Sequence, residues 1–367
     1  MMYVKDIIEI FENKYPKSLA YNWDNIGLII GDGMSKVEKV LVTLEATQAV
    51  VDEAVENKVD LIITHHPFIF KGIKKINKST TKGNDIYKLI RNDISLYSSH
   101  TNFDIAFDGL NDEIVKRLSL KDVQVLDYTF EEKLYKISVY TPASHQDDMR
   151  KAMADVGCGN IGNYSDCSFT FNGVGRFKPL NDSNPYIGVK NEIEAVEEVK
   201  IESICGESNL SQAINKIIKV HPYEEVAYDV YELKNTGKKY GLGRIGKLQD
   251  TMKLKELSAA LKELLNIESL KVTGNLEDDV KKIAVVTGSG VEFINKAHTM
   301  GADVLITGDV KYHDAQNALE LGIKLIDAGH FGSENIFADI VLQYLQKEFK
   351  NIEILKSKSN IDPFVII

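Results

Sequence analysis

Short apolar runs alternate with amphipathic stretches along most of the chain. Residues 25–32 and 37–47 are runs of the length expected for buried strands, and residues 4–11 place apolar side chains at helical spacing. The alternation resumes in the last third of the chain, where residues 283–287 predict a strand and residues 334–349 predict a final helix. Strands that alternate with helices in this way indicate a layered α/β fold.

Residues 127–240 depart from this alternation of strands and helices. Their pattern predicts the order strand, helix, strand, strand, helix, strand, which is typical of a small ferredoxin-like α+β domain. We therefore expect this segment to be a domain inserted into a larger one. Residues 1–126 and 241–367 would then form the two halves of the outer α/β domain.

An internal repeat relates these two outer halves. Residues 41–66 and 284–309 align at one constant offset, so that Val42 meets Val285 and Asp60 meets Asp303. Each copy has the pattern strand, helix, strand, and each second strand ends in polar residues. The sequence thus predicts two related α/β halves that face each other, with the insert between them.

Several strand ends in this arrangement carry side chains that bind metals. Ligands of open α/β sheets collect at the carboxyl ends of the strands. The candidates are His65, His66, His100, Asp104, Asp309, His330 and Glu334. Imidazole and carboxylate are ligands of zinc, iron and manganese, and so many donors favour two divalent ions that share bridging carboxylates. The sequence therefore predicts that the halves surround a dinuclear metal site.

Each of these side chains also has a structural interpretation. Asp104 and Glu334 could cap helix N-termini, and Asp309 could do the same for the helix after it. His313, near Asp309, is a weaker candidate for a functional role. Residues 241–246, "GLGRIG", match a dinucleotide-binding pattern but lack the strand–turn–helix context that such a site needs. Two His-x-x-x-carboxylate pairs at equivalent points of the repeat favour the metal site.

Seven ordered motifs resemble those of the NIF-three-like family, whose members are also described as GTP cyclohydrolase I type 2 homologs. The motifs are "WDNIGLIIGD", "THHPFIF", "HTNFD", "HPYEEVAYDVY", "GLGRIG", "ITGDVKYHDA" and "DAGHFGSE". The resemblance implies a toroidal homohexamer, a trimer of dimers, with a dinuclear centre in each subunit. It implies the metal ligands His65, His66, Asp104, His330 and Glu334. It also implies that residues 127–240 are a PII/CutA-like insert.

Composition limits the partners and the compartment. The chain has 44% hydrophobic and 27% charged residues, as ordinary globular proteins do. Its net charge of −10 gives no general attraction to nucleic acids or anionic membranes, and no apolar run approaches the length of a membrane span. Three cysteines are too few for a disulfide framework and indicate a reducing cytoplasm.

The predicted function is a metal-dependent hydrolase of a small polar or nucleotide substrate, similar to GTP cyclohydrolase I type 2. His100 is the candidate proton shuttle, because it lies beside the expected ligands and imidazole exchanges protons near neutral pH. The alternative is a non-catalytic hexameric assembly that binds metal, in which the insert senses a small molecule or gates the cavity. Turnover by the metal-loaded protein distinguishes the two.

Overall fold

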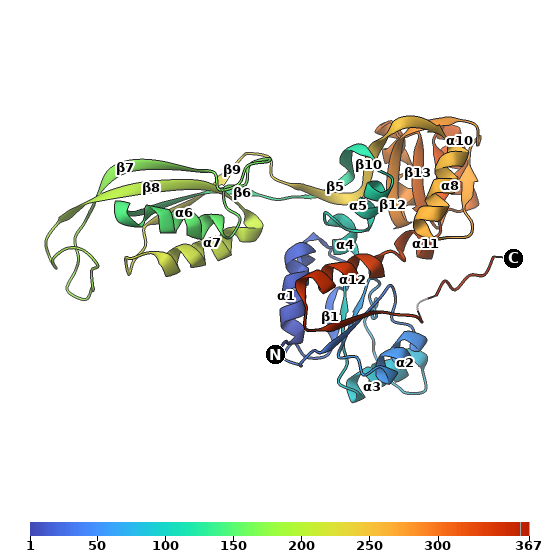
Figure 1. Cartoon of the computed structure of the whole chain (residues 1–367), viewed down its shortest axis with the longest axis horizontal. Coiled ribbons are helices and arrows are strands. Elements are labelled where there is room, and N and C mark those ends of the chain that lie inside the picture. The colour runs from blue at the N-terminus through green and yellow to red at the C-terminus, as the bar shows by residue number, and fades with distance from the viewer. Residues whose placement is uncertain (360, 367) are drawn as a thin grey trace. The chain divides into compact units, whose positions relative to one another are not determined.

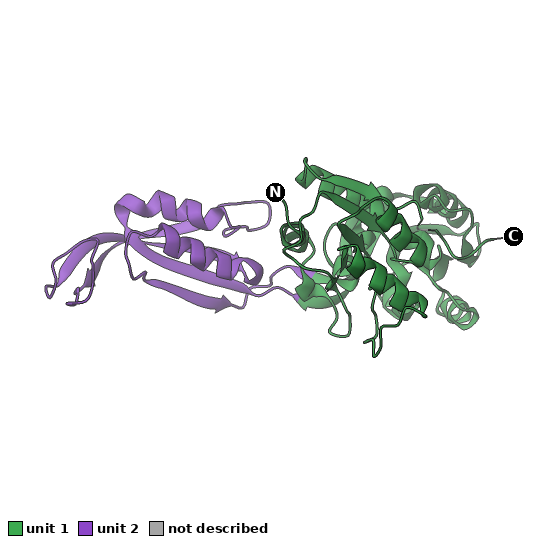
Figure 2. Cartoon of the chain, turned by 90° about the horizontal axis from the view of Figure 1, so that it is seen from below, with its two compact units in different colours: residues 1–130, 240–367 green, residues 131–239 purple. Residues whose placement is uncertain are grey.

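The chain forms two compact units (Figure 2). The computed structural model describes residues 1–359 and 361–366. Unit 1 consists of Met1–Phe130 with Tyr240–Ile367, and unit 2 consists of Glu131–Lys239. The result is a mixed α/β fold with several sheets, as the alternating pattern predicts.

The first sheet of unit 1 has five strands in the order β1-β4-β3-β2-β15. The strands are β1 (Gly27–Ile30), β2 (Lys39–Thr43), β3 (Leu61–Thr64), β4 (Ser95–Ser98) and β15 (Glu353–Lys356). All neighbours run parallel except β1, which is antiparallel to β4. All four residues of β3 are buried, because a parallel strand covered on both faces has no solvated side.

Helices cover both faces of this sheet (Figure 1). Helices α1 (Val4–Lys14) and α12 (Phe337–Glu348) pack on one face, and α2 (Gln48–Glu56) and α3 (Thr81–Arg91) pack on the other. Each helix turns one apolar stripe toward the strands, as its spacing of hydrophobic residues predicts.

The second sheet has six strands in the order β11-β14-β13-β12-β10-β5. The strands are β5 (Lys121–Glu131), β10 (Lys239–Lys253), β11 (Lys271–Thr273), β12 (Asp279–Ser289), β13 (Val304–Gly308) and β14 (Lys324–Asp327). Strands β12, β13 and β14 are parallel. Helix α8 (Leu254–Leu265) packs on one face, and α9 (Ile294–Thr299) and α10 (Tyr312–Leu321) pack on the other.

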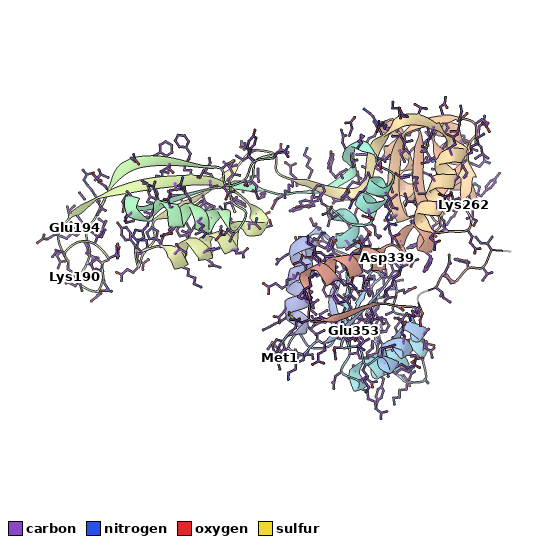
Figure 3. All side chains as sticks on the ribbon, in the orientation of Figure 1. Met1, Lys190, Glu194, Lys262, Asp339 and Glu353 are labelled. Atoms are coloured by element: carbon purple, nitrogen blue, oxygen red, sulfur yellow. The ribbon has the colours of Figure 1, made fainter. Side chains whose placement is uncertain are left out.

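Each sheet takes one edge strand from the other half of the sequence. Strand β5 comes from the first half and joins the second sheet, whereas β15 comes from the second half and joins the first. Glu353 of β15, labelled in Figure 3, pairs with Lys39 of β2 at 3.0 Å. One apolar core lies between the sheets and includes residues of α1, α8 and α12. The repeat did not predict this exchange, because neither edge strand belongs to it.

The final helix predicted over residues 334–349 is confirmed with a slightly later start, and the structure separates it from a short helix before it. A short helix, α11 (His330–Glu334), ends where the prediction began, and α12 starts at Phe337. The division has a clear physical consequence. Glu334 is buried at the end of α11, while α12 is free to follow the first sheet and bury Val341 and Leu345.

Arg244 of β10 is a fully buried cation that links the second sheet to residues from the first half of the sequence. Its guanidinium makes a bidentate pair with Asp112 of α5 (Leu110–Arg117), at 2.6 Å and 2.9 Å. Its other N–H groups donate to the carbonyls of Gly241, Gly243, Ile105 and Ala106. A buried charge is stable only when it is satisfied in this way. The "GLGRIG" segment is therefore part of a strand, without the context of a dinucleotide site.

Unit 2 is a four-stranded antiparallel sheet in the order β7-β8-β6-β9. The strands are β6 (Leu134–Pro142), β7 (Ser168–Phe177), β8 (Glu194–Gly206) and β9 (Tyr228–Leu233). Helices α6 (Gln146–Ala154) and α7 (Glu207–Val220) cover one face and close a core of their own (Figure 1). The predicted insert, residues 127–240, spans this unit, and its assignment to the PII/CutA-like fold stays a prediction.

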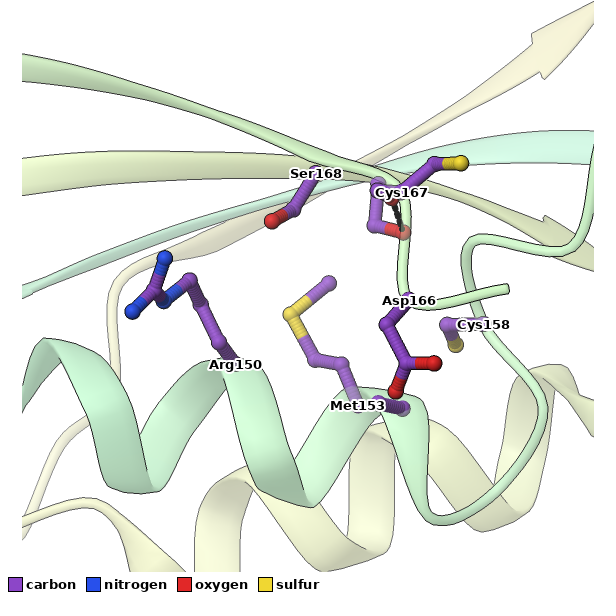
Figure 4. A pocket seen from close by; sticks show the side chains of 8 residues that line it. Arg150, Met153, Cys158, Asp166, Cys167 and Ser168 are labelled. Atoms are coloured by element: carbon purple, nitrogen blue, oxygen red, sulfur yellow. Dashed lines mark hydrogen bonds between the residues drawn. The ribbon is translucent and has the colours of Figure 1, made fainter. Parts of the chain in front are cut away.

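All three cysteines lie in unit 2 as free thiols. Cys158 and Cys205 are buried in its core, as expected for small apolar side chains. Cys158 and Cys167 line a small pocket together with Arg150 and Met153 (Figure 4). No thiol lies among the metal-binding candidates.

The ends of unit 2 lie side by side, which allows the unit to be removed cleanly. The N–H of Glu132 donates to the carbonyl of Lys238 at 2.9 Å. We predict that replacing residues 133–237 by an Asn-Gly hairpin turn leaves a folded protein, because the apolar core of unit 2 shares no residue with those of unit 1. Circular dichroism and metal content per chain test this. Aggregation, or loss of metal binding, would show that the unit is integral to the outer domain.

Arg244 offers a second test of the fold. Arg244→Lys keeps the charge but cannot reproduce the bidentate pair and the four carbonyl contacts, so we expect a loss of about 3 kcal/mol in the free energy of unfolding. Arg117→Lys is the matched control, since Arg117 pairs with Glu113 at 2.7 Å on the partly exposed face of α5. Its loss should stay below about 1 kcal/mol. Equal losses in urea unfolding would contradict the role assigned to Arg244.

Candidate metal centre

The candidate ligands follow the carboxyl ends of parallel strands in both sheets. His65 and His66 come directly after β3, and His100 is the N-cap of α4 (Thr101–Ile105), two residues after β4. In the second sheet, α11 begins with His330 shortly after β14. Both short helices carry their carboxylate four residues after the histidine, so the repeat seen in the sequence is also present in space.

His65 is the most buried donor of the group. Its side chain has no exposed surface, and its Nδ1–H donates to the carbonyl of Ser99 at 2.9 Å. Burial lowers the pKa of His65 to about 4, so the ring is neutral and Nε2 carries a free electron pair. That nitrogen lies 3.6 Å from Oδ1 of Asp104 and 3.8 Å from Oε1 of Glu334.

Two further donors, His66 and His330, meet at Glu334. Its Oε2 lies 2.9 Å from Nε2 of His66 and 3.1 Å from Nε2 of His330, and the two imidazole nitrogens are 3.3 Å apart. Burial alone would raise the pKa of Glu334, but hydrogen bonds from the histidines around it hold that pKa well below its usual range. The hydrogen bond with Glu334 raises the pKa of His330 to about 10.

His100 and His330 are each oriented by an aspartate. Nδ1 of His100 lies 3.0 Å from Oδ1 of Asp24, and Nδ1 of His330 lies 2.8 Å from Oδ2 of Asp309. A carboxylate on Nδ1 fixes the tautomer and turns Nε2 outward, which is how ligand histidines are commonly held. Asp24 lies within the motif "WDNIGLIIGD", but its contact with His100 was not predicted, because 76 residues separate the two and no spacing rule connects them.

Two buried atoms show that these residues suit a cation. Nε2 of His65 and Oδ1 of Asp104 have no hydrogen-bond partner in the part of the chain that the structure describes. Burial and the nearby Glu334 charge raise the pKa of Asp104 well above its usual range. Buried polar groups nearly always have a partner, and a divalent ion would satisfy an imidazole nitrogen and a carboxylate oxygen together.

The donor atoms fall into two overlapping groups. Within each group they lie no more than 4.8 Å apart: His65, His66 and His100 form one, and His66, His330 and Glu334 form the other. Asp104 belongs to neither group and reaches the site through His65. The structure therefore brings together all five residues expected as ligands. His100, which is not one of the five, lies beside them.

The capping alternatives find no support in this geometry. The N-caps of α4 and α11 are His100 and Gly329, so Asp104 and Glu334 lie inside their helices. Lys311, not Asp309, is the N-cap of α10, and Asp309 contacts His330 instead. His313 is exposed, and its ring contacts that of Tyr312.

Comparison with known proteins identifies the family. Residues 2–363 match the family model of Duf34/NIF3 (NGG1p interacting factor 3). The chain belongs to the Duf34/NIF3 family. The resemblance predicted from the seven motifs is thus confirmed.

Relatives of this Duf34/NIF3 chain match it from end to end. A protein of Halalkalibacterium halodurans is 41% identical over 365 residues, covering 98% of both chains, and one of Bacillus subtilis is 40% identical over 368 residues, covering 99% of this chain and 98% of the relative. Both are named GTP cyclohydrolase 1 type 2 homolog. The crystal structure of a Bacillus cereus protein related to NIF3 is 40% identical, with a TM-score of 0.92 over 100% of this chain and 99% of that one.

Gly288 of β12 lies against the candidate centre of this Duf34/NIF3 protein. It has a φ of +64°, and a Cβ placed there would lie 2.1 Å from Oε1 of Glu334 and 3.4 Å from Nε2 of His330. A side chain at this position must displace the carboxylate. Gly288 therefore shapes the site without offering a donor atom.

We predict that Gly288→Ala weakens metal binding about 10-fold or more, as loss of supporting contacts around a metal typically does. Gly322→Ala is the control, since Gly322 also has a positive φ, +79°, but no atom lies within 4 Å of its Cβ position. Both variants carry the same backbone strain, so only the contact with Glu334 separates them. Metal titration monitored by calorimetry measures the difference. Equal affinities would mean that Glu334 is not a ligand.

Proposed function

We propose that this protein binds two divalent metal ions and hydrolyses a small polar or nucleotide substrate with them. The ligands are His65, His66, Asp104, His330 and Glu334, and the ions are zinc, iron or manganese. The observation that carries the proposal is the pair of buried atoms without a partner, Nε2 of His65 and Oδ1 of Asp104, 3.6 Å apart beside three further donors. The name of the curated relatives supports a nucleotide substrate.

The number of donors supports two ions. Five protein ligands exceed what one tetrahedral zinc ordinarily takes, and the two donor groups share His66. Glu334 faces both groups, because its Oε1 approaches His65 while its Oε2 approaches His66 and His330. A carboxylate in that position is suited to bridging.

The residues of the chain have distinct tasks in this proposal. Bound divalent ions would supply Lewis-acid polarisation of the substrate and of the attacking water. Ser99 and Asp309 hold the rings of His65 and His330 with Nε2 toward the centre. Asp24 holds Nδ1 of His100, which leaves Nε2 of that ring to accept a proton from the water and to return it to the leaving group. His100 is thus the proposed catalytic residue, and Asp24 positions it.

The proposal includes a homohexameric assembly, a trimer of dimers, as the family resemblance implies. The proposed location is the cytoplasm, as the small number of cysteines indicates. Unit 2 is proposed as a PII/CutA-like insert. Within the described residues, no helix is both long and apolar enough to cross a membrane.

The test measures metal content and turnover on the same samples. Protein loaded separately with zinc, iron and manganese should hold two ions per chain and hydrolyse at least one member of a panel of nucleotides and phosphoesters. His100→Ala should keep both ions and lose about 10²–10⁴-fold in turnover, since that is what general acid–base catalysis contributes. His298→Ala, which changes an exposed histidine of α9, is the control and should retain full turnover.

Two outcomes would contradict the proposal. One ion per chain in excess metal would exclude the dinuclear centre, and loss of metal in His100→Ala would make His100 a ligand. Metal-loaded protein without turnover on any substrate would favour the alternative, a non-catalytic assembly that binds metal.

A further inference from the structure

Trp23 is an exposed aromatic side chain held at the edge of the candidate metal centre. It is 59% exposed, although it is among the most apolar residues of the chain. Its ring stacks on Tyr21 at 5.6 Å and meets the edges of Phe70 at 6.0 Å and His100 at 6.3 Å. The ring of His100 in turn lies 5.2 Å from that of His65. Trp23 is therefore one side chain away from the proposed ligands.

Polar contacts fix the turn that carries this ring. The side chain of Asp24, the next residue, has no exposed surface and accepts hydrogen bonds from the N–H and the hydroxyl of Thr101, as well as from His100. The N–H of Tyr21 donates to Oγ1 of Thr101 at 3.2 Å, and the side-chain amide of Asn25 donates to the carbonyl of Ile69. The exposed ring is thus held in place before any ligand arrives, so ordering it costs little on binding.

The segment around Phe70 is basic in an otherwise acidic chain. Residues 67–84 contain five lysines and no carboxylate, whereas the whole chain has a net charge of −10. Lys71, Lys74 and Lys75 are exposed and make no ion pair with any residue that the structure describes. Such a segment attracts an anion electrostatically. Phe70, whose ring contacts Trp23, lies four residues after His66, and the lysine-rich segment continues directly from it.

We infer that Trp23 and Phe70 form a stacking subsite for the planar heteroaromatic ring of an anionic ligand, a nucleotide. The inference rests on the proposed function and names its substrate class. Aromatic side chains bind any nucleobase through its π-face, and the lysine-rich loop suits the phosphate. The ring contact between Trp23 and His100 places the stacked base beside the proposed proton shuttle. The alternative is that a second copy of the chain binds over Trp23, in which case it would separate the centre from solvent.

The probe is GMP, compared with guanosine and ribose 5-phosphate, on the full metal-loaded chain. Trp23 is the single tryptophan of the sequence, so its fluorescence reports directly on this subsite. We expect GMP and guanosine to quench it and ribose 5-phosphate to leave it unchanged. By equilibrium dialysis, Trp23→Ala should bind GMP about 10-fold or more weakly, and Trp23→Phe should retain most of the affinity. Phe169→Ala removes a 61% exposed aromatic ring of unit 2 and should bind as the unmodified protein does.

The metal content of every variant is measured in parallel, which separates this inference from the proposed function. Suppose that the protein holds two ions per chain and binds GMP, but that GMP neither quenches Trp23 nor binds more weakly to Trp23→Ala. This result would overturn the subsite and leave the metal centre standing. No binding of GMP, AMP or CMP to the metal-loaded protein would overturn it as well. A Trp23→Ala variant that dissociates in gel filtration without losing GMP affinity would assign the ring to a contact between copies. If the unmodified protein does not bind two ions per chain, the proposed function itself is refuted.

Discussion

The guanidinium of Arg244 is the interaction on which the geometry of unit 1 depends. It reaches from β10 of the second sheet to Asp112 and to the carbonyls of Ile105 and Ala106. Those carbonyls come immediately after Asp104, so the position of that carboxylate relative to the second sheet is set by a cation that never touches it. A buried charge that lost these partners would cost several kcal/mol, and the loop therefore has little freedom to drift.

The centre is built from two copies of one local design. In each half a parallel strand ends, a histidine opens or precedes a five-residue helix, and a carboxylate follows four residues later. An aspartate from elsewhere holds Nδ1 of each histidine. The copies differ in what they add: the first half contributes His65 and His66, where the second has Gly308 and Asp309. The resulting cluster is asymmetric although the two halves are related, because the first half supplies most of its donors.

Sequence patterns predicted the parts of this architecture that depend on local spacing. The layered α/β class and the five expected ligands follow from hydrophobic period, strand ends, the repeat and the family motifs. The contacts of Asp24 and Arg244 were not predicted although the quoted motifs contain both residues, because a motif does not show which distant groups its side chains meet. The final helix, α12, was predicted from its spacing, whereas the five-residue helix α11 before it was not, because so short a helix shows no apolar period.

The exchange of edge strands sets the order in which the molecule can mature. Strand β2 has an open edge until β15 reaches it, and β15 is synthesised long after β2. An uncovered parallel edge is prone to pair with other chains, so the newly made first half needs protection while synthesis continues. The donors are split in the same way, with His65 and Glu334 separated by most of the chain. Such distant contacts are slow to form, and the cluster of donors is complete only after both halves have been synthesised.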